Sequence, residues 1–283
     1  MSDIKNNNWS HIIQPKNKWF EINFREIWEY RDLILIFVKR DIVSTNKQTV
    51  LGPLWFFLAP LFTVFIYTFV FNSIAGISTD GIPAPLFYLA GTTLWNYFQS
   101  CFMATTTTFS SNASLFGKVY FPRLVSPIST VISNLLKFFI QFGMFLCLWS
   151  YYFYKGEVHL TIAVFFFPIL ILLLAGISLG LGIIISSMTT KYRDLSYFIS
   201  FGITLLMYVT PVIYPLSSIP AKFKFFIEYN PIAPIIEAFR YGFMGKGAFS
   251  LFDLGYSFIV MVVLLLIGTV LFNRTEKTFM DTV

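Results

Sequence analysis

A few charged residues stand where their chemistry would matter most. Lys137 falls inside a long apolar run, in the stretch SNLLKFFIQF. A lysine at the centre of an apolar helix in a membrane costs roughly 2.5–3.5 kcal/mol. It therefore requires a partner, a water-filled cavity or a position nearer an interface. Glu237 and Arg240 stand three residues apart, a spacing that lets a carboxylate and a guanidinium pair on one face of a helix.

The residues needed for several kinds of catalysis are missing from the sequence. Gly245-Lys246 is followed by Gly247, and no GxxxxGK[ST] phosphate loop occurs. His11 and His159 are far apart, and Cys101 and Cys147 form no CxxC pair. The apolar runs carry no group of carboxylates suited to proton relay. We therefore expect no enzyme activity, no metal site and no cofactor bound by this chain.

The composition points to an all-α integral membrane protein. Of the 283 residues, 56% are hydrophobic and only 12% are charged, whereas a soluble domain carries roughly 25% charged residues. Polar residues are nearly absent from several long stretches, which is typical of membrane-spanning helices. A net charge of +6 in a soluble protein would suggest nucleic acid. Here it indicates Lys and Arg retained on one side of a membrane, and we expect no nucleic-acid partner.

The apolar runs predict six transmembrane helices, because each run is long enough to cross about 30 Å of hydrocarbon. They are residues 51–75, 86–108, 124–153, 161–187, 194–214 and 252–272. Residues 20–43 alternate charged and apolar positions at helical spacing, which predicts an amphipathic interfacial helix. The expected organisation is a cytoplasmic tail with this helix at 1–50, a transmembrane domain at 51–273 and a cytoplasmic tail at 274–283.

The distribution of Lys and Arg predicts the orientation. With the N-terminus inside, most basic residues fall in the inner segments, so both termini are expected in the cytoplasm. The quartet Tyr-Arg-Asp-Leu occurs at 30–33 and again at 192–195, with different flanking residues. Both copies fall at the expected cytoplasmic boundary. Both copies have residue types that suit a membrane interface, so an internal repeat is not needed to explain them.

Two further patterns concern helix packing and the outer side. Gly176 and Gly180 form a GxxxG motif, which favours close packing of helices in a membrane. Segment 214–251 is apolar but interrupted by prolines, and Asn230-Pro231 is typical of a helix start. We expect two short helices joined near Asn230. They are too short to span, so they either dip into the membrane and return or lie on its outer surface.

Seven stretches in order resemble one family along nearly the whole chain after residue 20. They are LIFVKRDIVSTNKQTVLGPLWFFLAPL, STDGIPAPLF, LFGKVYFPRLVSPI, KYRDLSYFISF, TPVIYP, YNPIAPIIEAFR and EKTFMDTV. The chain resembles permease subunits of bacterial ABC-2-type exporters, in the branch that exports O-antigen and teichoic acid. The resemblance implies the ABC-2 permease fold, with a cytoplasmic coupling helix and outer re-entrant gate helices. It also implies a homodimer that joins two P-loop ABC ATPase subunits, which hold the ATP and Mg²⁺.

The expected function is outward movement of a lipid-linked polysaccharide (O-antigen, capsule or teichoic-acid type) across the bacterial inner membrane, with membrane lipids around the protein. One alternative is an ABC-2 exporter of a drug or lipid. A second alternative is a membrane-embedded transferase acting on lipid-linked sugars, although no convergent catalytic set supports it. A scaffold without transport activity is a third.

Candidate residues fall into three groups. Loop 112–123 carries two bases, no acid and several apolar residues, which predicts a docking surface for the ATPase; a helix resting on lipid headgroups is the alternative. The coupling candidates are Leu115, Phe116, Lys118, Val119, Tyr120, Phe121, Pro122 and Arg123, with Arg31 and Arg40 of the interfacial helix. The candidates for the substrate conduit are Trp95, Tyr97, Phe98, Lys137, Tyr208 and Tyr214; packing is the alternative role of the aromatic residues. The outer-gate candidates are Pro220, Asn230, Pro231, Glu237 and Arg240.

Overall fold

The computed structural model describes residues 24–46, 52–116, 118–119, 121–189 and 194–278. Within these residues every regular element is a helix, which confirms the all-α fold. Four segments are long and apolar enough to cross a membrane: Trp55–Ile74, Val125–Tyr154, Ile162–Thr189 and Leu251–Thr275. The second and fifth spans expected from the sequence, residues 86–108 and 194–214, correspond to α4 and α9, and these two helices do not meet the criteria of length and apolar composition together.

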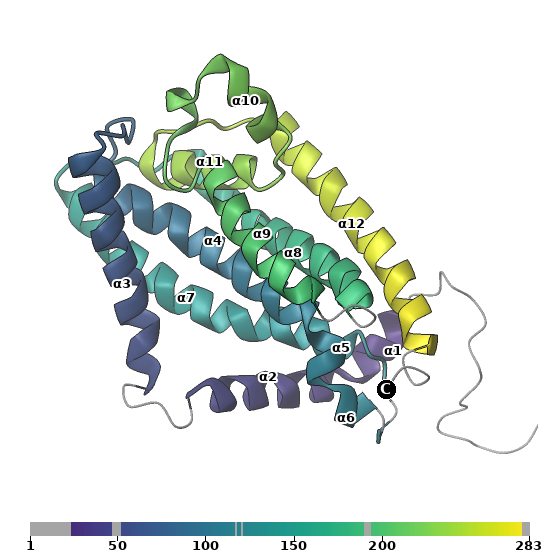
Figure 1. The fold of residues 1–283 in the computed structure, drawn as a ribbon. Coiled ribbons are helices and arrows are strands. Elements are labelled where there is room, and N and C mark those ends of the chain that lie inside the picture. The colour runs from purple at the N-terminus through teal and green to yellow at the C-terminus, as the bar shows by residue number, and fades with distance from the viewer. Residues whose placement is uncertain (1–23, 47–51, 117, 120, 190–193, 279–283) are drawn as a thin grey trace, which may run out of the picture.

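The long helices form the body of the molecule and the short elements lie at its two ends (Figure 1). The body consists of α3 (Trp55–Tyr67) continued by the π-helix η2 (Thr68–Ile74), α4 (Ala84–Thr106), α7 (Val125–Tyr154), η3 (Ile162–Phe166) with α8 (Phe167–Thr189), α9 (Leu195–Val209) and α12 (Leu251–Thr278). One end carries α1 (Phe24–Glu29), α2 (Arg31–Asn46), η1 (Gly52–Leu54), α5 (Thr108–Ser111) and α6 (Ala113–Phe116). The other carries η4 (Leu216–Ser218), α10 (Ala221–Glu228) and α11 (Ala233–Met244).

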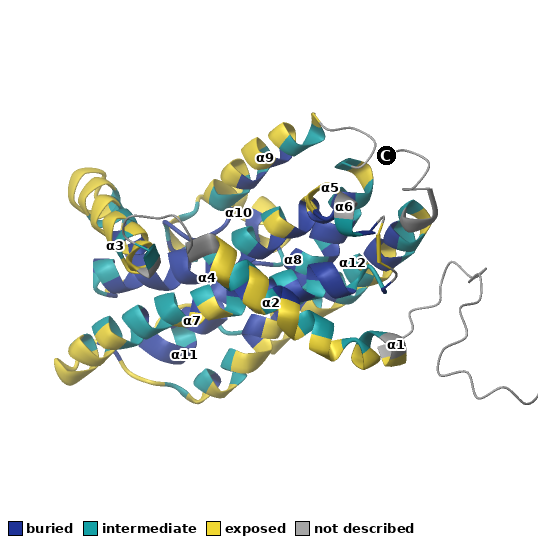
Figure 2. Ribbon diagram, turned by 90° about the horizontal axis from the view of Figure 1, so that it is seen from below, coloured by how far each residue is buried: buried dark blue, intermediate teal, exposed yellow. Residues whose placement is uncertain are grey.

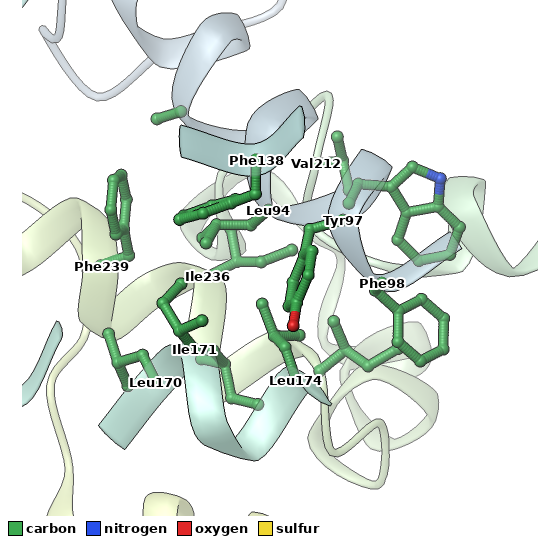
Figure 3. Close-up of a cluster of buried hydrophobic side chains, with 14 of the residues drawn as sticks. Leu94, Tyr97, Phe98, Phe138, Leu170, Ile171, Leu174, Val212, Ile236 and Phe239 are labelled. Carbon is green, nitrogen blue, oxygen red and sulfur yellow. The ribbon is translucent and has the colours of Figure 1, made fainter. Parts of the chain in front are cut away.

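Helix α4 is the central helix of the bundle, and its position explains its composition. It packs against α8, α7 and α3, and most of its residues are buried. Its polar residues Asn96, Gln99 and Ser100 are partly buried and lie on the side of α3 and α7, so α4 can carry them without an all-apolar surface. Figure 3 shows the apolar core on another face of α4, where Leu94, Tyr97 and Phe98 meet α7, α8 and α11.

Glycines set the close approach of α8 and α12. A Cβ atom on Gly180 would lie 2.9 Å from the backbone carbonyl carbon of Leu264, and one on Gly176 would overlap Met261. A Cβ on Gly268 of α12 would in turn meet the backbone oxygen of Gly180 at 2.9 Å. The GxxxG motif therefore packs helices together, as expected from the sequence.

Helix α2, which the sequence analysis expects at the membrane interface, runs across the lower end of the bundle in Figure 1, transverse to α3, and packs on the first turns of α7. Phe37 is its buried anchor, while Leu35 and Ile36 remain exposed. This combination of one buried face and one exposed apolar face is what an interfacial helix requires.

Two helices leave large apolar faces uncovered. Figure 2 shows exposed positions along much of α3 and α9. Phe62 and Phe65 on α3, and Phe198 and Phe201 on α9, are more than half exposed. Helix α9 has few neighbours and spans 15 residues, about 22 Å of helix, less than the hydrocarbon thickness. These faces require lipid or a further protein surface.

Candidate functional site

A polar cleft lies where α2, α3, α4 and α7 meet. It consists of two adjoining cavities of about 360 Å³ and 630 Å³. Ser100, Asn134 and Lys137 line both cavities, so Lys137 stands at their junction. The smaller cavity reaches between α3, α4 and α7, and the larger one reaches the C-terminal part of α2. The lysine that the sequence marked as exceptional therefore faces a cavity, and it is only partly buried.

The walls of the cleft come from one polar stripe on each of two helices. On α4, Asn96, Gln99 and Ser100 follow at i, i+3 and i+4, which places them on one face. On α7, Asn134, Lys137 and Gln141 follow at i, i+3 and i+7 and share a face in the same way. Sequence reasoning singled out Lys137 alone. The helical spacing of the amides and hydroxyls around it was the signal that could have found the others.

Hydrogen bonds order part of this stripe. The Asn96 side-chain amide donates to Gln141 Oε1 at 3.3 Å, which joins α4 to α7 across the cleft. The Trp95 indole donates to Gln99 Oε1 at 3.0 Å. The Asn134 amide donates to the carbonyl of Thr130 at 3.0 Å. Asn96, Gln99, Asn134 and Gln141 all line the smaller cavity, and each amide has further donor or acceptor capacity beyond these bonds.

At the α2 end, one ion pair borders the larger cavity. Arg40 and Asp41 lie 2.9 Å apart. Arg40 also donates to the Asn112 side chain at 3.4 Å and lies 4.7 Å from the Phe37 ring centre. Ser133 of α7 donates to Asp41 Oδ2 at 3.4 Å, which ties α2 to α7 one helical turn before Lys137. Arg31, the other basic candidate on α2, is exposed and lies 5.9 Å from the Trp28 ring centre.

The aromatic conduit candidates do not form one surface. Trp95 and Phe98 are buried in the core with their rings 5.4 Å apart. The expectation that these two rings line an open path is wrong for this structure, because neighbouring helices cover the part of α4 that carries them. Tyr97 is also buried and packs on Phe138 at 5.2 Å, although it reaches the rim of the smaller cavity. Tyr208 is more than half exposed on α9, and the Tyr214 hydroxyl donates to its carbonyl at 2.9 Å.

A second stripe on α9 carries exposed hydroxyls. Tyr197, Ser200, Thr204 and Tyr208 are exposed and follow at i, i+3, i+7 and i+11, which is one helical face. Ser200 and Thr204 each return a hydrogen bond to a carbonyl four residues earlier. Their oxygens can still accept from a ligand. The sequence analysis named only Tyr208 from this face.

The loop expected to dock an ATPase is folded inward. Phe116 and Phe121 are each only 4% exposed and pack with Phe37, Phe109 and Phe272 in a second apolar cluster. Our expectation of an exposed aromatic surface is therefore wrong for both residues, because α2, α5 and α12 supply a core for them. Lys118 and Val119 are exposed. Tyr120 lies outside the described residues.

The other loop candidates connect this cluster to α7. Leu115, Pro122 and Arg123 are half-buried. The Arg123 guanidinium lies 5.5 Å from the Phe116 ring centre. The carbonyl of Pro122 accepts from the backbone N–H of Val125, the first residue of α7. Movement of the exposed tip would therefore reach α7 and α2 directly.

At the opposite end, the two short helices α10 and α11 of the expected outer segment are joined near Asn230, as expected. Asn230 is buried, its Oδ1 accepts from the backbone N–H of Ile232 at 3.0 Å, and its amide donates to Thr210 at 2.8 Å. Helix α11 begins at Ala233, two residues later than a cap at Asn230 with Pro231 as the first helical residue would predict. The half-buried Pro231 accepts a hydrogen bond from Ser257 of α12 at 2.8 Å. The junction is thereby fixed to α9 and α12.

Glu237 and Arg240 form the expected pair on α11. Their side chains lie 2.9 Å apart and are almost fully buried. Arg240 also donates to the carbonyls of Pro211 and Val212 at 2.7 and 2.9 Å and stacks over the Phe87 ring at 3.7 Å. Helix α11 is therefore part of the core. By contrast, Pro220 and the aromatic residues of α10 (Phe223, Phe225 and Phe226) are exposed, so α10 is the peripheral part of the outer segment.

The comparisons with known proteins agree with this architecture. Residues 32–244 match the family described as ABC-2 type transporter. The O-antigen export system permease protein RfbA of Klebsiella pneumoniae is 29% identical over 250 residues, 88% of this chain and 94% of the relative. RfbA of Myxococcus xanthus is 27% identical, with 92% and 98% covered. The polysialic acid transport protein KpsM of Escherichia coli is 26% identical, with 85% and 92% covered. Because the family match covers most of the bundle described above, the chain belongs to the ABC-2 type transporter family.

Proposed function

We propose that this protein is the membrane-spanning permease subunit of an ATP-driven exporter that moves a lipid-linked polysaccharide outward across the bacterial inner membrane. The observation that carries the proposal is the likeness, over most of both chains, to permeases named for O-antigen and polysialic acid transport. The polar cleft at Lys137 and the hydroxyl stripe of α9 give it a physical basis. Both offer hydrogen-bonding groups to a hydrated chain within an otherwise apolar protein.

The energy for transport comes from separate subunits in this proposal. The sequence has no phosphate loop, so two P-loop ABC ATPases bind the ATP and Mg²⁺. The exposed tip at Lys118 and Val119, together with Arg31 of α2, forms their docking surface. The path from tip to transmembrane helices runs through the cluster of Phe37, Phe121 and Phe272.

Two copies of the chain complete the transporter in this proposal, with α4 and α9 also crossing the membrane and both termini in the cytoplasm. The uncovered faces of α3 and α9 support a second copy, because α9 alone is short for lipid and presents hydroxyls. The polysaccharide then passes along the α9 stripes of the two copies. Hydroxyls and tyrosine rings offer many weak contacts, which allow a sugar chain to slide.

Deletion of the gene tests the proposal. The deleted strain is expected to lose its surface polysaccharide and to accumulate lipid-linked polymer inside, with both restored by the plasmid-borne gene. A tagged copy is expected to co-purify with a P-loop ATPase. Unchanged surface polysaccharide, with export of a drug or another lipid impaired instead, would replace this function with the alternative.

A further inference from the structure

The cleft at Lys137 has the composition of a site for an anionic group. Among the described residues that line the smaller cavity, Lys137 is the one charged side chain. The others are amides and hydroxyls of α3, α4 and α7, together with apolar residues of α3 and Phe138 of α7. A lysine ammonium surrounded by neutral donors is suited to phosphate oxygens, which it meets as a point charge with three N–H donors.

The charge of Lys137 is not neutralised within the described part of the chain. No described residue forms an ion pair or hydrogen bond with it. Asp41 is near enough to attract it electrostatically. That carboxylate, however, already contacts Arg40 at 2.9 Å and accepts from Ser133. The larger cavity therefore contains two cations and one anion, and it keeps a positive surplus at Lys137.

The depth and the walls of the cleft point to a phosphate carried by a lipid. Ser133 contacts the interfacial helix α2, and Lys137 follows four residues later, about 6 Å further along α7. The cavity therefore starts at the level of α2 and extends inward by about one helical turn. Its α3 wall is formed by Trp55, Phe56, Ala59 and Pro60, which suits an acyl or isoprenoid chain better than water.

We propose that this cleft binds the phosphate or diphosphate that joins the exported glycan to its lipid carrier, with Lys137 as the charged contact. The amides of Asn96, Asn134 and Gln141 and the hydroxyl of Ser100 supply neutral donors around it. The proposal rests on the proposed function. It adds a headgroup site that is separate from the sugar-contacting stripe of α9.

A binding experiment on the full-length protein in phosphatidylcholine nanodiscs tests the site without requiring transport. The probe is farnesyl diphosphate, compared with farnesol and with inorganic pyrophosphate. We expect the diphosphate lipid to bind at least about tenfold more tightly than either fragment, because it alone supplies both the anion and the apolar chain. The Lys137→Met variant is expected to lose at least about tenfold in affinity, while Lys137→Arg retains most of it.

A matched control and a competitor separate this account from its rivals. Lys155→Gln removes an exposed lysine directly after the other end of the same helix and is expected to leave binding unchanged. If Lys137→Met binds the probe as tightly as wild type, the site is overturned and Lys137 merely reaches toward headgroups. If phosphatidylglycerol displaces the probe at equal concentration, the carrier assignment is overturned and bulk phospholipid is the occupant.

Failure of this inference is distinguishable from failure of the proposed function. Lys137→Met removes a charge from a partly buried position without adding volume, so normal membrane abundance is expected. If the gene is required for surface polysaccharide but the variant exports at the normal rate, the headgroup site is wrong and the exporter stands. If deletion leaves the polysaccharide unchanged, the exporter is wrong, while the binding experiment still decides the site.

Discussion

At the residue scale, Arg240 shows which contacts can be predicted from residue spacing and which cannot. The three-residue separation from Glu237 predicted the ion pair correctly. It could not predict that the same guanidinium donates to the carbonyls of Pro211 and Val212, nearly 30 positions earlier, because that contact depends on how α9 ends against α11. The pair is therefore one part of a larger buried cluster that also holds the Phe87 ring.

Loss of Arg240 is expected to be costly. Arg240→Met strands Glu237 in the core and leaves two carbonyls without a donor, which should reduce stability by about 3–5 kcal/mol. Exchange of the two charges, Glu237→Arg with Arg240→Glu, should not restore it, because a carboxylate cannot donate to those carbonyls. Thermal unfolding of the purified protein in detergent measures both effects.

A surface pair provides the control for that experiment. Lys224 and Glu228 lie 3.9 Å apart on α10, and both side chains are about half exposed. Exchange of their charges should change stability by no more than about 1 kcal/mol. A charge-exchanged Glu237/Arg240 variant as stable as wild type would show that the carbonyl contacts do not matter.

Sequence reasoning at this scale identified Lys137 but not the residues around it. A lone lysine in an apolar run is conspicuous because its cost is large. Neutral amides such as Asn96, Gln99 and Asn134 cost less free energy than a lysine inside a membrane, so they do not stand out from the other residues of their helices. Their significance depends on two stripes facing each other, which only the packing of α4 on α7 establishes.

At the element scale, loop 112–123 contains residues that fold inward and residues that are free for the proposed docking. Its amino acids predicted an apolar surface, but the second cluster takes up Phe116 and Phe121. Apolar residues in a loop are ambiguous from sequence, because the same side chains serve a partner or the chain's own core. The exposed tip is left with Lys118 and Val119 as the testable contact residues.

Substitutions in this loop should therefore fall into two classes. Phe121→Ala should lower stability by about 3–5 kcal/mol and reduce membrane abundance, because it leaves a cavity beside Phe37 and Phe116. The double variant Lys118→Glu with Val119→Asp should keep normal abundance but lose ATPase association. Lys222→Glu, on the outer segment, is the exposed control. Co-purification of the ATPase at the wild-type ratio by the double variant would remove this tip from the docking surface.

The contact of α8 with α12 makes a second prediction at this scale. Gly180→Ala should destabilise the protein by about 1–3 kcal/mol, since the new methyl group meets the backbone at Leu264. Gly143→Ala on α7 is the matched control, because nothing lies within 4 Å of its Cβ position. Equal thermal stability of the two variants would mean that α8 and α12 separate more easily than their packing indicates.

At the scale of the whole molecule, the sequence predicted the all-helical membrane bundle, a helix before its first long helix and two short helices within segment 214–251. Long apolar runs and interruptions by proline are local patterns, so these elements could be predicted from the sequence. It could not show that α11 is buried and α10 peripheral, because both read as short apolar helices. That difference arises from contacts with α4, α8 and α12, which are distant in the chain.

The proposed second copy predicts which helices meet. In a Cys147→Ser background, which removes an exposed thiol, Phe201→Cys on α9 should form a disulfide between two chains under mild oxidation. Ile259→Cys on α12 is similarly exposed but faces lipid in this account, and it should remain monomeric on the gel. Cross-linking through position 259 and not 201 would place the interface on α12 instead.

The central claim is that this chain moves a lipid-linked polysaccharide across the membrane with energy from a separate ATPase. The most direct measurement uses inside-out vesicles that contain the chain and its ATPase. Radiolabelled lipid-linked glycan is supplied in their outer leaflet, and a glycosidase is then added outside the vesicles. We predict that ATP makes a growing fraction of the glycan resistant to the enzyme. We also predict that the Lys118→Glu/Val119→Asp variant abolishes this protection. The result would contradict the account if the complex is assembled and hydrolyses ATP, yet all of the glycan stays accessible to the glycosidase.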